Sequence, residues 1–285
     1  MKTFIDMFKR ALFLTLLIAP AFAANASNYT YLALGDSIAY GYDPTIASPT
    51  PSQFVGYPEI TAGILHLLQP GKEVNASCPG QTSGSFLVGG PDNGCQLFKD
   101  TVGLHTSYTG TQSSFAVSQL QSNKHIDLVT LSIGGNDLLL LQESCASAPS
   151  FAACVEAALP GVLQTYGANL TQILTEIRVQ AGYTGTLILV EYAAPNNDPL
   201  FIQAVAALNS VMVQVGTPFG AKFADSFTAF QVASALYGGD PCAAGLLVRL
   251  STTTCDVHPN RAGQNLLAAT VLFAIGNVHG LHKNP

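Results

Sequence analysis

The chain has 285 residues, of which 48% are hydrophobic and only 10% charged, and its formal net charge is −6 at pH 7. A chain of this length and composition can bury one sizeable core, so we expect a single folded domain over residues 27–285. The negative charge and the scattered Lys and Arg residues offer no basic face for phosphates, which argues against a nucleic-acid partner.

The first 26 residues have the pattern of a secretory signal peptide. Lys2, Lys9 and Arg10 precede an apolar run, 11–23, which ends in small residues. The alternative is an N-terminal membrane anchor, but this run is shorter than the ~20 residues that span a bilayer. We therefore expect a cleaved signal, a secreted or periplasmic protein, and no integral membrane segment after cleavage.

Helical and strand patterns alternate along the rest of the chain. Strands are predicted at 29–34, 73–76, 126–133, 186–190 and 222–224. Helices are predicted at 60–68, 115–120, 161–181, 199–215 and 261–276. The segments expected to be irregular or mixed are 38–58, 84–110, 144–160 and 225–236. This alternation is typical of an α/β protein with a parallel sheet and helices on both faces.

The six cysteines fall into three neighbouring pairs, which suits an exported protein. Fifteen pairings are possible, and we favour the sequential one because each pair encloses a short loop-like segment, whose closure is worth ~3 kcal/mol. The expected disulfides are Cys78–Cys95, Cys145–Cys154 and Cys242–Cys255. The rival reading is a metal site, but no CxxC or HExxH motif is present, so we expect none.

Polar and glycine residues follow three of the predicted strands. Ser37 comes after the first strand, Gly80 after the second and Asn136 after the third. The carboxyl ends of parallel strands meet at one edge of a sheet, where ligand sites lie. A serine there that acts as a nucleophile needs a general base, a group that orients the base, and donors for an oxyanion.

The chain resembles the SGNH hydrolases, also called GDSL-type esterases and lipases, in four blocks that occur in the family's order. These blocks are the Gly-Asp-Ser of 35–37, the glycine at 80, the Gly-Gly-Asn-Asp of 134–137, and the histidine of Asp-Val-His-Pro-Asn at 256–260. The resemblance implies a three-layer α/β/α sandwich of the flavodoxin-like SGNH type, with a central parallel sheet of about five strands. It also implies an enzyme that needs no cofactor.

The same resemblance assigns the site residues. Ser37 is the expected nucleophile, and the Ser37 N–H, the Gly80 N–H and the Asn136 side chain are the expected oxyanion donors. Asp137 also follows the motif, but we expect it to hold the turn or cap the next helix. Among six histidines, His258 is the expected general base, in a loop just before the last helix.

The group that orients His258 is left open, because the family's aspartate three residues ahead is replaced by Cys255. Either Asp256 reaches the histidine Nδ1 atom, or the Cys255 carbonyl accepts that hydrogen bond and the centre works as a Ser-His dyad. We expect side chains two residues apart in extended backbone to diverge, which keeps the dyad in play. Asp240 is a remote third candidate.

These expectations lead to a secreted serine esterase or lipase that hydrolyses carboxylic esters through an acyl-enzyme. The alternatives are an acyltransferase that uses the same residues and a non-catalytic binding module on the same fold. We expect a monomer that takes a small-molecule, lipid or carbohydrate ester; the acyl chain length is not predicted.

Overall fold

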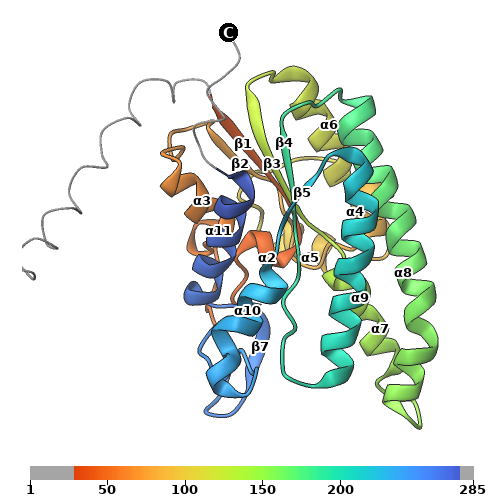
Figure 1. The fold of residues 1–285 in the computed structure, drawn as a ribbon. Coiled ribbons are helices and arrows are strands. Elements are labelled where there is room, and N and C mark those ends of the chain that lie inside the picture. Colours follow the sequence, from red (N-terminus) through yellow and green to blue (C-terminus); the bar gives the residue numbers. More distant parts are fainter. Residues whose placement is uncertain (1–28, 277–285) are drawn as a thin grey trace, which may run out of the picture.

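The central sheet contains five parallel strands in the order β2-β1-β3-β4-β5, within a computed structural model that describes residues 29–276 (Figure 1). The predicted signal peptide lies outside the described residues. The strands are β1 Thr30–Gly35, β2 Glu73–Asn75, β3 Ile126–Ser132, β4 Thr186–Val190 and β5 Lys222–Ala224. Each strand was expected from its run of apolar and β-branched residues, and its bounds agree with the prediction to within about one residue.

Helices cover both faces of the sheet, which makes the predicted three-layer α/β/α sandwich (Figure 1). Successive residues of β1 show why both faces are buried: Leu32 and Leu34 pack towards α8, whereas Tyr31 and Ala33 pack towards α11. On the α8 face lie α4 Ser83–Val88, α6 Gln112–Ser122, α7 Gly135–Cys145, α8 Phe151–Thr175 and α9 Pro199–Gly216. On the other face lie α3 Tyr57–Ile64, α10 Ser226–Ser234 and α11 Arg261–Ile275.

The longest helix differs from its prediction. We expected a separate excursion at 144–160 before a helix at 161–181, but α8 already begins at Phe151 and continues through Pro160. Pro160 lies inside this helix, although proline removes a helical hydrogen bond. Buried Val155 before the proline and Tyr166 after it keep the helix on its course, and Glu176–Gln180 adds a π-helical turn at the end.

Two segments expected to be irregular contain short helices. The 84–110 region holds most of α4 and also α5 Cys95–Thr101, while 225–236 is largely α10. Side-chain caps account for two of these helices, because Thr82 accepts from the Ser85 N–H and Asp225 accepts from the Thr228 N–H. The 38–58 region, by contrast, contains only α2 Ser37–Tyr40, the 3₁₀ turn Pro51–Gln53 and the first residues of α3.

A second, two-stranded antiparallel sheet lies just before α11. It consists of β6 Leu247–Arg249 and β7 Cys255–Pro259. The prediction that His258 lies in a loop is therefore wrong, because β7 carries it. The sequence concealed this strand because it is short and contains one exposed valine, Val257, among polar residues.

The cysteines form three disulfides, each between sequence neighbours. Cys78–Cys95 closes the segment that follows β2, Cys145–Cys154 joins α7 to α8, and Cys242–Cys255 ties the start of β7 to the chain before β6. The first bridge lies in a small core with Tyr40, Phe54 and Leu104, and the second joins two helices of the α8 face. The third braces the strand that carries His258.

One described helix, α9, has the length and hydropathy of a membrane-spanning segment. Its apolar residues Ala204, Leu208 and Met212 are buried in the core cluster of the α8 face. A helix of a globular core passes the same test of length and composition, and the packing of α9 agrees with that reading.

The order of the strands reverses at β1, between β2 on one side and β3 on the other. The chain moves from β1 outward to β2 and then crosses back to β3 on the other side of β1. In sheets with this order, a crevice opens beyond the carboxyl ends of β1 and β3. Ser37 directly follows β1, and Asn136 follows β3, so both lie at this crevice.

Candidate active site

Ser37 lies at a sharp turn between β1 and α2. Gly35 has a φ of +138°, and a Cβ atom there would lie 2.2 Å from the Ser132 carbonyl oxygen. Only glycine fits this position. The Asp36 carboxylate then accepts from the Ile38 N–H and caps α2, of which Ser37 is the first residue. The turn presents the serine at the carboxyl edge of the sheet, with only 6% of its surface exposed.

His258 lies against Ser37, although 221 positions separate them in the chain. The distance from His258 Nε2 to Ser37 Oγ is 2.8 Å. The other ring nitrogen, Nδ1, hydrogen-bonds to Asp256 Oδ1, and the same oxygen accepts from the His258 N–H at 3.1 Å. Ser37, His258 and Asp256 thus form one continuous chain of hydrogen bonds.

The expectation that Asp256 and His258 diverge is wrong, because side chains two residues apart lie on the same face of a strand such as β7. Burial acts to raise the pKa of Asp256, but the hydrogen bond and the charge of the His258 ring hold that pKa below its ordinary value. Asp256 is therefore an ionised carboxylate at neutral pH. Asp240, the remote candidate, instead accepts the N–H groups of Cys242 and Ala243 in a turn.

Asn136, near the start of α7, lies at the same pocket as Ser37. Its Nδ2 group donates to the Gln81 carbonyl at 3.0 Å and lies 3.4 Å from Asp36 Oδ2. Its Oδ1 atom accepts from Asn93 Nδ2 at 3.0 Å. The amide is buried and held at both ends, with its N–H2 group facing the turn that carries Ser37.

Gly80 lies in the segment after β2, at a φ of +83°. A Cβ atom there would lie 2.2 Å from the Asn93 carbonyl oxygen, and the Gly80 carbonyl accepts from the Asn93 N–H at 2.8 Å. The segment is joined to the turn that carries Ser37, because the Cys78 N–H donates to the Gly35 carbonyl at 3.0 Å. Gly80 itself is not among the residues that line the pocket around Ser37.

Asp137 holds the strand ends together. Its two carboxylate oxygens accept from the Ser83 N–H and the Ser83 hydroxyl, at 2.9 and 2.6 Å. These bonds tie the start of α7 to the start of α4. The structural part expected for Asp137 agrees with these contacts.

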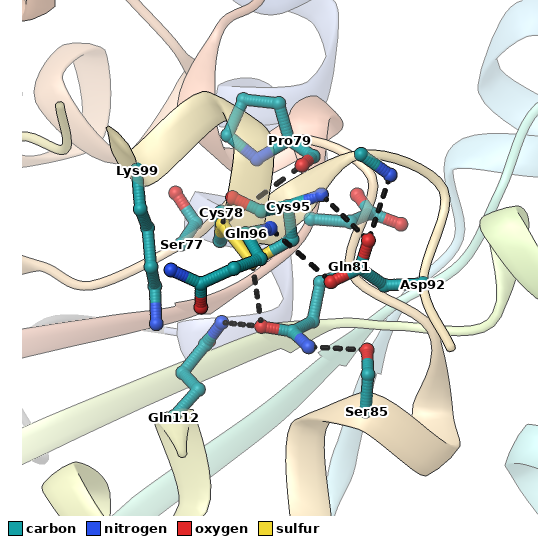
Figure 2. The surroundings of a disulfide bond; sticks show 12 residues. Ser77, Cys78, Pro79, Gln81, Ser85, Asp92, Cys95, Gln96, Lys99 and Gln112 are labelled. Atoms are coloured by element: carbon teal, nitrogen blue, oxygen red, sulfur yellow. Dashed lines mark hydrogen bonds between the residues drawn. A yellow bond between two sulfur atoms is a disulfide. The ribbon is translucent and has the colours of Figure 1, made fainter. Parts of the chain in front are cut away.

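Two glutamines that no sequence pattern indicated, Gln81 and Gln112, lie beside the Cys78–Cys95 disulfide (Figure 2). Gln112 pairs with both backbone groups of Gly35: its Oε1 accepts from the N–H at 2.6 Å, and its Nε2 donates to the carbonyl at 2.9 Å. Gln112 Nε2 also lies 3.4 Å from Gln81 Oε1, and Gln81 Nε2 donates to Ser85 Oγ. Both glutamines are fully or nearly buried beside the Cys78–Cys95 disulfide.

Asp36 is a buried carboxyl beside the site. Burial raises its pKa to about 6, against the opposing effects of a hydrogen bond from Tyr192, the Ile38 N–H and the nearby His258 ring. The Tyr192 hydroxyl donates to Asp36 Oδ2 at 2.5 Å. Tyr192 follows β4 and was not predicted, because a lone tyrosine after a strand carries no signal of its own.

An apolar pocket extends from Ser37 between α7, the segment after β4, and α9 to α11. It encloses about 770 Å³ of free space, including its open mouth. Its apolar walls include Leu138, Leu139, Pro195, Val205, Leu208 and Phe230. On another side of the site, the Tyr42 ring meets the His258 ring edge-on at 4.9 Å and stacks on Phe54. Of the aromatic residues in 38–58, Tyr42 thus borders the site, whereas Tyr40 and Phe54 fill a small core.

Comparison with solved structures shows the same fold. The phospholipase A1 from Streptomyces albidoflavus is 20% identical, with a TM-score of 0.61, over 87% of this chain and 100% of that one. An extracellular lipase from Streptomyces rimosus is 20% identical, with a TM-score of 0.60, over 86% of this chain and 99% of that one. An acetylxylan esterase from Geobacillus stearothermophilus is 21% identical, with a TM-score of 0.53, over 88% of this chain and 95% of that one. No curated protein sequence matches the chain significantly.

The family described as GDSL-like Lipase/Acylhydrolase matches residues 33–266. This range contains the turn at Ser37, Asn136 near the start of α7, and the strand that carries His258. The match covers most of the chain and agrees with the resemblance seen in the four sequence blocks. The chain therefore belongs to the GDSL-like lipase/acylhydrolase family and is a carboxylic ester hydrolase.

Proposed function

We propose that this protein is a secreted serine esterase or lipase that works through an acyl-enzyme on Ser37. The observation that carries the proposal is the 2.8 Å contact between Ser37 Oγ and His258 Nε2, with Asp256 on the other ring nitrogen. With Nδ1–H donated to an ionised carboxylate, Nε2 bears the free lone pair and accepts the serine proton.

The reaction then proceeds in two steps. Ser37 Oγ attacks the ester carbonyl while His258 takes its proton, and the imidazolium returns that proton to the leaving alcohol as the acyl-enzyme forms. Water, deprotonated by His258, next attacks the acyl-enzyme and releases the acid, and the proton returns to Ser37. Asp256 fixes the ring and stabilises its positive charge in both steps.

The negative oxygen formed in each step needs donors. We assign these to the Ser37 N–H, the Gly80 N–H and the Asn136 side chain, of which Asn136 already lies at the pocket. The weak 3.4 Å contact of its N–H2 group with Asp36 is the one that an oxyanion would replace. One such donor is worth roughly 3 kcal/mol in the transition state.

The pocket supports an apolar acyl group as the part of the substrate next to Ser37. Similar structures include both a phospholipase A1 and an acetylxylan esterase, so the fold alone does not select an acyl length. The leucine, proline and phenylalanine walls would gain from each methylene that they cover, about 0.8 kcal/mol apiece. We therefore assign to this enzyme esters whose acyl chains are longer than acetate.

Export follows from two separate features. The signal-peptide pattern at 1–26 directs secretion, and three disulfides among the described residues suit an oxidising compartment. Fractionation of expressing cells should place the enzyme outside the cytoplasm, with an N-terminus just after Ala23 or Ala26. Retention in the cytoplasm with an intact N-terminus would remove this part of the proposal.

The experiment that tests the mechanism compares wild type, Ser37→Ala and Ser118→Ala on p-nitrophenyl esters from acetate to dodecanoate. Ser118 is an exposed serine of α6, so its variant controls for the loss of a hydroxyl. We expect kcat/KM to rise by up to about fourfold per methylene until the pocket is filled. We expect Ser37→Ala to lose at least about 10³-fold in kcat and Ser118→Ala to match the wild type.

The outcomes separate the alternatives. Activity retained by Ser37→Ala would refute the acyl-enzyme proposal, and a complete lack of turnover in the wild type would favour the binding module. A preference for acetate would contradict the assignment of longer acyl chains while leaving the mechanism intact. Release of p-nitrophenol that speeds up with an added alcohol, with an ester as product, would identify an acyltransferase.

A further inference from the structure

Asn93 is an exposed residue that contacts two of the proposed oxyanion donors, Gly80 and Asn136. Its side-chain N–H2 group donates to Asn136 Oδ1 at 3.0 Å. Its main-chain N–H donates to the Gly80 carbonyl at 2.8 Å, and its own carbonyl lies in the space that a Cβ atom on residue 80 would need. It therefore links the segment after β2 to α7.

The side-chain contact decides which way the Asn136 amide faces. The Gln81 carbonyl is an acceptor only, so the end of the amide 3.0 Å from it must be the N–H2 group. The opposite end is then the oxygen, which needs a donor. Asn93 supplies that donor, and a flipped amide would place an oxygen against the Gln81 carbonyl and N–H2 against N–H2.

Asn93 is itself held in place from both sides. Asp92 Oδ1 accepts from the N–H groups of Gly94 and Cys95, at 2.8 and 3.0 Å. Cys95 is bonded to Cys78, two residues before Gly80 (Figure 2). Asn93 thus lies in a turn, 92–95, that is hydrogen-bonded internally and covalently tied to Cys78, and its side chain points towards α7.

We infer that Asn93 is a positioning residue that keeps the Asn136 N–H2 group aimed at the developing oxyanion and holds the backbone at Gly80 in place. This inference rests on the proposed function, because it concerns the same donors. It assigns a role in transition-state stabilisation to a residue outside the four sequence blocks. The role acts through Asn136 and Gly80, without any contact of Asn93 with the reacting atoms.

The test compares Asn93→Ala with the isosteric Asn93→Asp. Alanine leaves Asn136 Oδ1 to water while Gln81 still holds the N–H2 end. An ionised aspartate repels Oδ1 and attracts N–H2, so it favours the flipped amide. We expect kcat to fall about tenfold for alanine and on the order of 10²-fold for aspartate, with KM changed less than about threefold.

Two controls accompany these variants. Asn123→Asp makes the same change of charge in the turn before β3, at the opposite edge of the sheet. Thermal unfolding of each variant checks the fold. Inhibition by phenylboronic acid, which forms a tetrahedral adduct with a nucleophilic serine, reports on the oxyanion donors when Ser37 and His258 are left unchanged. The inhibition constant should rise in the same order as kcat falls.

The results distinguish this inference from the function that it rests on. If Asn93→Asp is as active as Asn93→Ala or more so, or if the whole effect lies in KM, the positioning role is refuted. If Ser37→Ala keeps its activity, the proposed function fails first. An inactive Ser37→Ala beside two fully active Asn93 variants overturns only the inference about Asn93.

Discussion

In the proposed mechanism Asp256, two residues before His258, orients the histidine, in place of a carboxylate three residues before it. Strand β7 makes this possible because it turns Asp256 and His258 to the same side, while Cys255 points away and forms a disulfide with Cys242. The disulfide and the carboxylate thus occupy adjacent positions of one short strand without competing. The choice depends on backbone conformation at single residues.

Asp256→Asn tests that choice. The amide has no charge to stabilise the imidazolium, and it no longer favours the tautomer with a free Nε2, so we expect kcat to fall roughly 10³- to 10⁴-fold. Asp240→Asn is the matched control, because Asp240 only caps a turn. Steady-state kinetics on one p-nitrophenyl ester measure both. A loss below about tenfold in Asp256→Asn would point back to a Ser-His dyad.

Gly80→Ala tests the close approach of two backbones. The φ of +83° strains any Cβ-bearing residue, and the new Cβ would collide with the Asn93 carbonyl. We expect the free energy of unfolding to drop by about 1 to 3 kcal/mol and kcat to drop with it.

Gly89→Ala is the control for strain alone, since Gly89 has a φ of +72° and nothing within 4 Å of a Cβ atom. It should lose about 1 kcal/mol of stability and keep its kcat. Urea unfolding and ester kinetics give the two quantities. Equal effects of the two substitutions on kcat would show that the approach to Asn93 has no bearing on activity.

At the scale of elements, the disulfides divide into two kinds. Cys78–Cys95 and Cys242–Cys255 brace segments of the site, whereas Cys145–Cys154 joins α7 to α8 at a distance from Ser37 along α7. The long α8 helix needs such a brace, because Pro160 interrupts its hydrogen bonds and its first turns carry few buried residues.

Replacing both Cys145 and Cys154 by Ser should therefore lower stability but not activity. Closing a loop of nine residues is worth about 3 kcal/mol, so we expect the melting temperature to fall by several degrees. At temperatures below the transition, kcat should remain within about twofold of the wild type. A large loss of kcat in the fully folded variant would mean that α7 needs this brace to hold Asn136.

For the whole molecule, two neighbouring buried carboxyls contribute to the dependence of stability on pH. Burial raises the pKa of Glu59, whose carboxylate accepts from Asn75 and the Gly56 N–H and lies 3.7 Å from His105. Burial also raises the pKa of the neighbouring Glu73. Burial lowers the pKa of His105, so the titration of His105 changes stability with pH in the opposite direction to that of Glu59. The charge of Arg261 lowers the pKa of Glu59, but less than burial raises it.

An acid with a raised pKa holds its proton in the folded state at a pH where the unfolded chain has released it. The contribution of Glu59 to stability is therefore greatest below its ordinary pKa of about 4.5 and is lost as the pH rises through the folded value of about 7. We expect Glu59→Gln to lessen the decrease in unfolding free energy between pH 5 and pH 8, by up to about 2 kcal/mol. Glu156→Gln, on an exposed face of α8, is the control; denaturant titrations at both pH values measure the slopes. An unchanged slope in Glu59→Gln would show that Glu59 titrates as it does in water.

Local patterns in the sequence were enough to predict the five strands, the layered fold and the family. The periodicity of each strand and helix, and each motif of the family, can be read from a short stretch of neighbouring residues. The mostly apolar run 30–34 followed by Gly-Asp-Ser is enough to predict a buried strand that ends in a turn. The place of Ser37 and Asn136 at one edge then follows from the rule that parallel strands end together.

Only the tertiary structure decided which groups meet across that edge. Gln112 pairs with Gly35 from 77 positions away, Tyr192 reaches Asp36 from 156, and Asn93 meets Asn136 across 43. A glutamine, a tyrosine or an asparagine carries no local mark of such a contact. Its partner is set by the direction of side chains on elements that come together only when the whole sheet has formed.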